Sequence, residues 1–226
     1  MTSAVVAVVY SALVTNVWEQ PLFHFTHVHN LRDILAEKRL VSDSVMQSRG
    51  GVLRECGDRA VKAERRSRQI AVPPGGCPAD YVPFYFAPRS PMLYVISRGS
   101  VTTYRDGQPP LVYLVTSVDG VLESHRPWVF SDGNCASAIT RHFTDLNAMP
   151  SVVDWEIMAA RYWNNTADDG DRMRRRMAEL LVHEHLPMTA VHEAATYDQD
   201  HAQQVRRLLR EAGAELPVSV RPEWYY

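Results

Sequence analysis

The chain has 226 residues, enough for one large domain or two small ones with a substantial core. Hydrophobic residues make up 46% of it and charged residues 22%, which is the composition of an ordinary soluble globular protein. A formal net charge of −2 argues against a protein that binds nucleic acid through its overall charge, but not against a local basic groove.

Two features bear on the cellular compartment. The apolar run from Ala4 to Val14 lacks the basic residues that begin a signal peptide and is too short to span a bilayer. We expect it to form a strand or a docking segment, and we assign residues 1–17 to an N-terminal extension of unknown role. No transmembrane segment follows, and the three isolated cysteines offer neither a disulfide framework nor a thiolate zinc site. We therefore predict a cytoplasmic protein without membrane contact.

The first half of the chain contains one predicted strand and two predicted helices. The strand covers residues 23–26. A helix follows from Asn30, a suitable N-cap, because Leu31, Ile34 and Leu35 share one helical face. Residues 58–70 form a second, basic helix, which carries Arg59, Lys62, Arg65, Arg66 and Arg68. The stretch 72–83 is rich in Pro and Gly and is predicted to be loop.

The second half adds strands and one long helix. Residues 92–97 and 111–117 are rich in Val, Ile, Leu and Tyr, which favours two strands, and the turn 106–110 between them predicts that they are neighbours. Apolar residues recur at helical spacing over 199–212, and Gly213 is expected to end that helix. A last strand is predicted from Val218 to Arg221. Short strands between helices and long loops indicate a compact α+β domain.

Glu179 lies three residues after the triple arginine that ends at Arg176, and directly before the apolar run 180–182. Its segment fits two structures: the apolar residues follow helical spacing, and the run also fits a strand entered from a helix. We favour a helix to about Met177 and a strand from about Glu179. This choice places an exposed carboxylate at the mouth of a strand, beside arginines that could hold a phosphate-bearing substrate.

Three other groups of residues compete for the chemistry. His24, His27 and His29 invite a metal site, but His24 and His27 would face opposite sides of a strand and no HExxH motif is present, so we predict no metal. The aromatic block 81–94 could stack a flat base or fill a core. Residues 131–134 are a turn by composition, with no chemistry of their own. The chain also lacks a GxSxG elbow, a Walker A motif and a GxGxxG motif.

Taken in order, several segments resemble the DarT family. They are His24-Phe25-Thr26-His27 with Asn30-Leu31, Val61-Lys62 with Arg65-Arg66, Val82-Pro83-Phe84-Tyr85, Ala87-Pro88-Arg89-Ser90-Pro91-Met92-Leu93-Tyr94, Ser131-Asp132-Gly133-Asn134, Trp163-Asn164-Asn165-Thr166 and Arg175-Arg176-Met177-Ala178-Glu179-Leu180-Leu181-Val182. The resemblance covers about residues 18–226, which we treat as a single domain. It implies the ADP-ribosyltransferase fold, with a central split antiparallel sheet and peripheral helices.

The resemblance also implies a function and a role for each segment. DarT proteins are bacterial toxins that use NAD, with no metal, to ADP-ribosylate bases in single-stranded DNA, and a macrodomain antitoxin, DarG, reverses the modification. By the family's pattern Glu179 would be the catalytic carboxylate, and Arg65, or its neighbour Arg66, would contact NAD. The NAD pocket would be lined by His24, Thr26, His27 and Asn30. The DNA would lie against Trp163, Asn164, Arg172, Arg175 and Arg176. Thymidine is the expected base, and a monomer is expected.

Two alternatives stay open on the sequence. The first is a transferase of the same fold that modifies guanosine, RNA or protein. The second is a catalytically silent nucleic-acid-binding module that keeps only the fold. These alternatives differ in their products: the first still consumes NAD, whereas the second does not depend on Glu179 at all.

Overall fold

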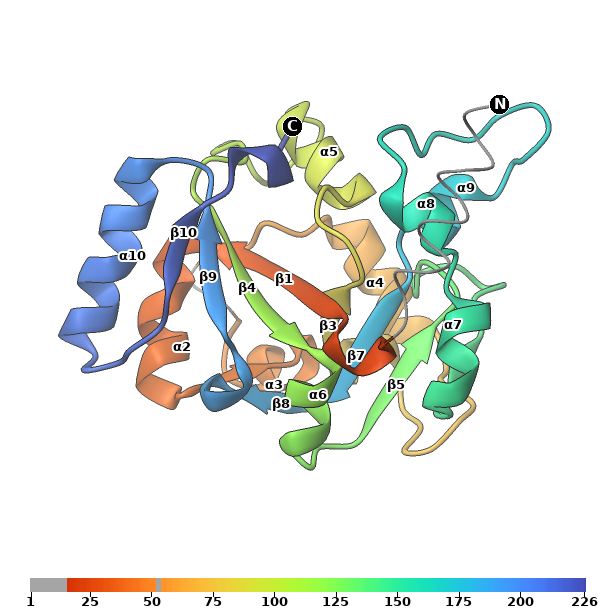
Figure 1. Cartoon of the computed structure of the whole chain (residues 1–226), viewed down its shortest axis with the longest axis horizontal. Helices are drawn as coiled ribbons and strands as arrows, with labels where there is room; N and C mark the ends of the chain where they lie inside the picture. Colours follow the sequence, from red (N-terminus) through yellow and green to blue (C-terminus); the bar gives the residue numbers. More distant parts are fainter. Residues whose placement is uncertain (1–15, 52–53) are drawn as a thin grey trace.

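The computed structural model describes residues 16–51 and 54–226, so the strand or docking segment expected at Ala4 to Val14 lies outside the described residues. One sheet of eight strands runs through the molecule in the order β10-β9-β4-β1-β3-β7-β5-β6 (Figure 1). In chain order these are β1 (Pro21–His27), β3 (Tyr81–Tyr85), β4 (Leu111–Ser117), β5 (Trp128–Ser131), β6 (His142–Phe143), β7 (Glu179–His183), β9 (Glu193–Thr196) and β10 (Val218–Val220). A small second sheet pairs β2 (Arg39–Val41) with β8 (His185–Pro187).

The large sheet is split between β1 and β3. The two strands are paired at a single position, Phe23 opposite Tyr85, whereas β1 pairs with β4 along its whole length and β3 does so with β7. All pairs in the sheet are antiparallel except β9 with β10. The predicted α+β class and the split, mostly antiparallel sheet are therefore confirmed.

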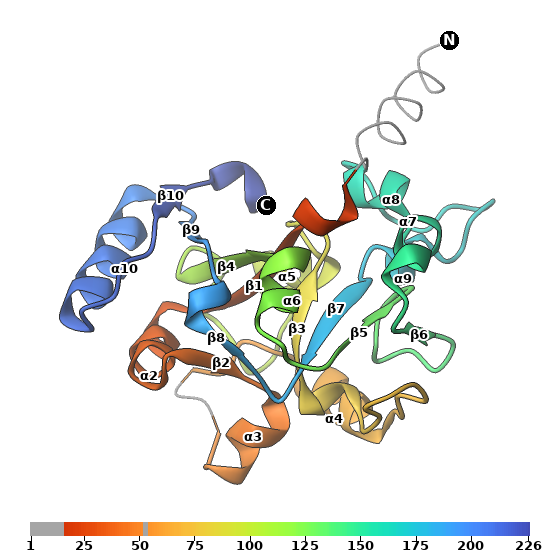
Figure 2. The ribbon, with the colours of Figure 1, turned by 60° about the horizontal axis from the view of Figure 1, so that its bottom comes forward.

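Helices lie beside both ends of the large sheet. They are α2 (Leu31–Glu37), α3 (Asp43–Ser48), α4 (Arg59–Ser67), α5 (Pro91–Ser97), α6 (Val118–Glu123), α7 (Met149–Val152), α8 (Trp155–Ala159), α9 (Arg172–Arg175) and α10 (Gln199–Glu211). Both views place α2 and α10 beside the β9–β10 end and α7, α8 and α9 beside the β5–β7 end (Figures 1 and 2). None of the helices in the described part of the chain is long and apolar enough to cross a membrane.

Three helical predictions are confirmed, and one strand prediction is wrong. Helices α2, α4 and α10 lie where they were expected, and Gly213 follows α10 with the left-handed φ of 62° that favours glycine. Residues 91–97, however, form helix α5 and not a strand beside β4. The Ser90 side chain accepts a hydrogen bond from the Leu93 backbone N–H, and Pro91 occupies the first helical position. These two start signals outweigh the strand propensity of the Val and Ile residues that follow.

The predicted loop 72–83 also ends earlier than expected, because β3 begins at Tyr81 and includes Pro83. A proline is tolerated there because β1 has already diverged, so its missing N–H deprives no neighbouring strand of a bond. The Pro83 carbonyl lies 2.9 Å from Nδ1 of His24 across the split. A side chain thus replaces a backbone hydrogen bond where the two halves of the sheet separate.

Strand β7 is anchored in the core. Leu180, Leu181 and Val182 are fully buried, and neighbouring strands pair with them on both sides. Burial of each such aliphatic side chain contributes about 1.5–3 kcal/mol to stability. The residue that begins this strand, Glu179, is therefore fixed to a rigid element.

Candidate active site

Glu179 is buried, with 0% of its surface exposed, so the expectation of an exposed carboxylate is wrong. The predicted junction itself is confirmed, since helix α9 ends at Arg175 and strand β7 begins at Glu179. The carboxylate is covered because β3 and β5 flank it: Tyr85 pairs directly with Glu179, and the β5 register puts Ser131 on its other side. The Ser131 hydroxyl accepts the Glu179 backbone N–H at 3.0 Å.

Arg65 balances the buried charge. Its Nη1 donates to Oε1 and Oε2 of Glu179 at 2.8 and 2.9 Å, across 114 residues of sequence. Burial lowers the pKa of Arg65, but the Glu179 carboxylate more than offsets this, so the net shift is upward and the guanidinium stays charged. Arg66 points elsewhere and pairs with Asp43 at 2.6 Å. Of the two candidate arginines, the structure brings Arg65 to the carboxylate.

Helix α4 presents Arg65 to the site. The Asp58 side chain caps its start by accepting hydrogen bonds from the Ala60 and Val61 backbone N–H groups. Arg54, four residues before Asp58, is held by Asn30 in the turn after β1: the Asn30 side chain donates to the Arg54 carbonyl and accepts from the Arg54 N–H. The predicted N-cap function of Asn30 is only partly correct. Asn30 does precede α2, but its side chain makes no capping hydrogen bond, because its amide is bonded to Arg54 in the segment before α4.

The turn 131–135 supports the carboxylate, which the sequence did not indicate. The Cys135 backbone N–H lies 3.5 Å from Oε1 of Glu179. Burial and the nearby carboxylate raise the pKa of the Cys135 thiol and of the Tyr85 hydroxyl, so both stay neutral at pH 7. Within the described residues, the Glu179 carboxylate is thus paired with the Arg65 cation and lies beside the neutral Cys135 and Tyr85 side chains.

Gly133 is needed in this turn because of close packing. A Cβ atom there would lie 2.3 Å from Nη1 and 2.9 Å from the backbone carbonyl oxygen of Arg174. Arg174 in turn donates to Asp132 at 2.8 Å, which joins the turn to helix α9. Burial alone would raise the pKa of Asp132, but hydrogen bonds from Arg141 and Arg174 hold it below its usual value. The composition of residues 131–134 predicts a turn; its contacts with Glu179 and α9 depend on strand register.

The residues predicted to line the NAD pocket lie on and after β1. His24 and His27 face opposite sides of the strand, as predicted; His24 contacts Phe84, and His27 contacts Tyr104. Asn30 donates to the Thr26 hydroxyl at 3.0 Å. Burial lowers the pKa of His24, although its bond to the Pro83 carbonyl opposes this, so the imidazole is neutral at pH 7. No group of three or more His, Cys, Asp or Glu side chains within residues 16–51 and 54–226 is arranged to hold a metal.

His27 makes stability depend on pH. Burial and the neighbouring His29 lower its pKa to about 4, despite the opposing charge of Asp106. The unfolded chain protonates this side chain near pH 6.5, whereas the folded protein does so only near pH 4. The free energy of unfolding is therefore unaffected by His27 above pH 6.5 and falls as the pH drops from 6.5 towards 4. We expect His27→Asn to reduce this acid-dependent decrease in the free energy of unfolding by up to about 3 kcal/mol. Urea unfolding at pH 7, 5.5 and 4.5 measures this; equal pH slopes in both proteins would contradict it.

The residues predicted to face DNA differ in their surroundings. Asn164 is exposed, and its carbonyl accepts from Nε of Arg172 at 3.0 Å. Arg175 pairs with Asp154 and Asp169 at 2.9 and 2.6 Å. Trp163 and Arg176 are buried, and the Arg176 guanidinium donates to backbone carbonyls, among them that of Pro88 at 2.8 Å. The arginines before Glu179 thus make close contacts within the protein, which a basic run in the sequence does not predict.

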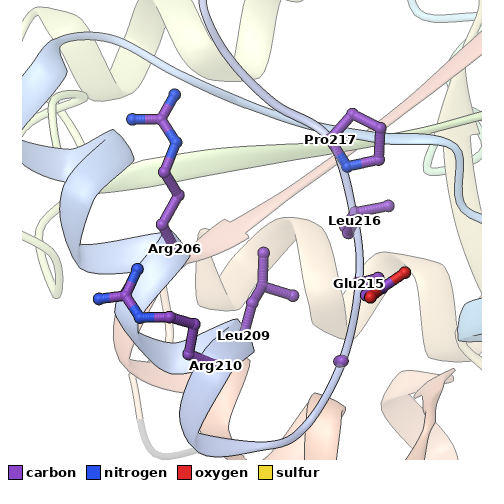
Figure 3. A pocket seen from close by; sticks show the side chains of 7 residues that line it. Arg206, Leu209, Arg210, Glu215, Leu216 and Pro217 are labelled. Atoms are coloured by element: carbon purple, nitrogen blue, oxygen red, sulfur yellow. The ribbon is translucent and has the colours of Figure 1, made fainter.

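A groove of about 630 Å³ lies elsewhere, between helix α10 and the segment that leads into β10 (Figure 3). Its lining includes Arg206, Arg210 and Leu216. Strands β9 and β10 form the far end of the sheet from β7, so this groove is separate from the Arg65–Glu179 pair.

The chain is similar to known proteins over most of its length. A family model described as "ssDNA thymidine ADP-ribosyltransferase, DarT" matches residues 23–226. The DNA ADP-ribosyl transferases of Mycobacterium tuberculosis and Thermus sp. are each 35% identical to it over 208 residues, which are 91% of this chain and 88% and 96% of those proteins.

Solved structures agree with this match. The structure of Thermus sp. 2.9 DarT in complex with ADP-ribosylated ssDNA superposes with a TM-score of 0.84 at 33% identity, over 92% of this chain and 97% of that one. The same protein in complex with NAD+ gives a TM-score of 0.80 at 33% identity, over 92% and 98% of the two chains. The match over residues 23–226 shows that this chain belongs to the DarT family.

Proposed function

We propose that this protein transfers ADP-ribose from NAD to a base, thymidine, in single-stranded DNA. The observation that carries the proposal is the buried Arg65–Glu179 pair at the start of β7, beside the split in the sheet. Support also comes from the Thermus relative, which has been captured both with NAD+ and with ADP-ribosylated ssDNA. The family resemblance assigns catalysis to the same two residues.

The chemistry requires a carboxylate in this position. The bond between the ribose anomeric carbon and the nicotinamide nitrogen breaks, nicotinamide leaves as a neutral molecule, and the sugar passes through an oxocarbenium-like state. Glu179 would hold a ribose hydroxyl and stabilise the developing positive charge from a site without bulk water. As the base nitrogen bonds to the anomeric carbon it loses its proton, and Glu179 would accept it.

Arg65 would have two functions. In the free protein it pairs with the buried Glu179 carboxylate and holds both of its oxygens in place. When NAD is bound, its donors would also contact a phosphate or a ribose oxygen of the substrate. Arg65 therefore belongs to the proposed catalytic pair, whereas Arg66 does not.

The two sides of the site would hold the two substrates. NAD would lie near the β1 residues His24, Thr26, His27 and Asn30, which the family pattern assigns to its pocket. Single-stranded DNA would lie against the segment from Trp163 to Arg172, in which Asn164 is exposed and Arg172 is half-buried. Arg175 and Arg176 would support this surface through their contacts with the protein. The proposed biological role is that of a cytoplasmic toxin, monomeric and neutralised by a DarG-like macrodomain antitoxin.

The direct test is the mass of the product. Oligonucleotides that carry a single thymidine, guanosine, adenosine or cytidine are incubated with NAD and the protein, together with an RNA of matching sequence. We expect one added ADP-ribose on the thymidine DNA alone, and fragmentation places it on the base. Modification of the guanosine DNA, the RNA or the protein itself would select one of the alternatives, and NAD left intact would remove the transferase assignment.

A further inference from the structure

An aromatic cluster joins three segments that are distant in sequence. It consists of Tyr94 on α5, Trp163 in the loop of residues 160–171, and Tyr226, with the Arg89 guanidinium 4.5 Å from the centre of the Tyr226 ring. Tyr94 makes edge-to-face contacts with both other rings. Figure 1 shows the end of the chain lying beside α5, in agreement with these contacts.

The Tyr226 hydroxyl is the polar centre of this cluster. It accepts a hydrogen bond from Nε1 of Trp163 at 2.9 Å and donates to the Arg89 carbonyl at 2.5 Å. The Tyr226 backbone is held by Gln108. The Tyr226 N–H donates to the Gln108 side-chain oxygen at 2.9 Å, and the Tyr226 carbonyl accepts from the Gln108 side-chain nitrogen. A single hydroxyl therefore links the 160–171 loop to the turn that precedes α5.

Both ends of that link need support. Arg89 has a φ of 56°, a left-handed conformation that costs a non-glycine residue of order 1 kcal/mol and persists only where the surroundings hold it. Trp163 is the one buried residue between 160 and 171, all of which the structure describes. Trp163 is thus the single side chain that anchors the loop in the protein interior. Its one polar side-chain atom, Nε1, is bonded to the Tyr226 hydroxyl.

A further link near Glu179 joins the turn before α5 to helix α8, which precedes the loop. Arg176, three residues before Glu179, donates to the Pro88 carbonyl at 2.8 Å and to the Ile157 carbonyl at 2.9 Å. The Pro88–Arg89 turn is therefore tied to the chain before the loop by Arg176 and to the loop itself by Tyr226. On its other side the loop is held by Arg172, which donates to the Asn164 carbonyl, and by Arg175, which pairs with Asp169.

We infer that Tyr226 is a positioning residue, whose hydroxyl sets the place of the 160–171 loop relative to the Arg65–Glu179 pair through Trp163. This inference rests on the proposed function in one respect, namely that the loop lies on the DNA side of the site. Catalysis is sensitive to such positioning, since a displacement of about 1 Å can cost up to about 100-fold in rate. Trp163, predicted to contact DNA, acts in this arrangement as the anchor of the loop.

The test compares Tyr226→Phe, Trp163→Phe and the double variant with a control, Tyr197→Phe. This control removes a hydroxyl from a ring that makes an edge-to-face contact with Tyr225 and is not part of the cluster. Amide hydrogen exchange reports on the loop without any substrate. We expect exchange in residues 160–171 to rise about tenfold in Tyr226→Phe, with no further rise in the double variant, while Tyr197→Phe matches the wild type. Unchanged exchange in Tyr226→Phe, or additive effects in the double variant, would overturn the inference.

Steady-state kinetics on the same proteins measures the effect of the loop position on catalysis. We expect Tyr226→Phe to raise the KM for the oligonucleotide about tenfold and to lower the ratio of DNA transfer to NAD hydrolysis by a similar factor. A parallel fall in both reactions would mean that the hydroxyl supports the whole site and would also overturn the inference. If the wild-type protein modifies no DNA, the proposed function fails, yet the exchange experiment still decides whether Tyr226 positions the loop.

Discussion

Replacing Glu179 by Gln is expected to lower ADP-ribosyl transfer at least about 1,000-fold. The amide keeps the size of the side chain but carries no charge, so it can neither stabilise the oxocarbenium-like state nor accept the proton of the attacking base. The loss should fall on kcat, because the charge acts mainly in the transition state. Single-turnover assays with saturating NAD and oligonucleotide measure it directly.

Burial of the Arg65–Glu179 pair dictates which variants are informative. Glu179→Ala, harmless to the fold if the carboxylate were exposed, would leave Arg65 as a buried charge without its carboxylate, at a cost of about 3–5 kcal/mol. A loss of activity could then reflect unfolding. The double variant Arg65→Met/Glu179→Gln removes both charges, so its stability should recover while its activity does not. Transfer within tenfold of the wild type in folded Glu179→Gln would remove Glu179 from catalysis.

The sequence predicts the elements of this site better than its contacts. The helix-to-strand junction before Glu179 could be predicted because periodic spacing ends there and a short apolar run begins. Burial of the carboxylate could not, because it results from β3 and β5 closing on both sides of β7, and strand order is a property of the whole sheet. The same limit applies to Ser131 and Cys135, which lie 48 and 44 residues before Glu179 in sequence. Their contacts with Glu179 follow from the pairing of β5 with β7.

The basic run shows a second limit. Arg174, Arg175 and Arg176 stand together in the sequence and invite a single role, but successive residues of a helical turn point in different directions. Arg174 meets Asp132, Arg175 meets Asp154 and Asp169, and Arg176 meets backbone carbonyls in the interior. Whether a cation is available to a phosphate depends on these partners, and composition does not identify them. The arginine that reaches Glu179 comes from a different helix, 114 residues earlier.

Replacing Arg65 is the other change with a large expected effect, and its neighbour Arg66 provides the control. Arg65→Lys keeps a positive charge, but an ammonium on a shorter side chain lacks the planar guanidinium that now reaches both carboxylate oxygens. We expect NAD turnover to fall about 100-fold, with stability lower by about 1–3 kcal/mol because the buried bonds are only partly replaced. Arg65→Ala should lower NAD turnover and stability further, since it leaves the Glu179 carboxylate buried without its cation.

Arg66→Ala separates a specific role of Arg65 from a general effect of positive charge on helix α4. Arg66 is half-exposed and paired with Asp43 at the surface, so its loss should change stability by less than about 1 kcal/mol and leave turnover near that of the wild type. Titration calorimetry with NAD and urea unfolding of the three variants give the comparison. If Arg65→Lys and Arg66→Ala weaken turnover equally, the guanidinium beside Glu179 has no special function, and the buried pair serves the fold alone.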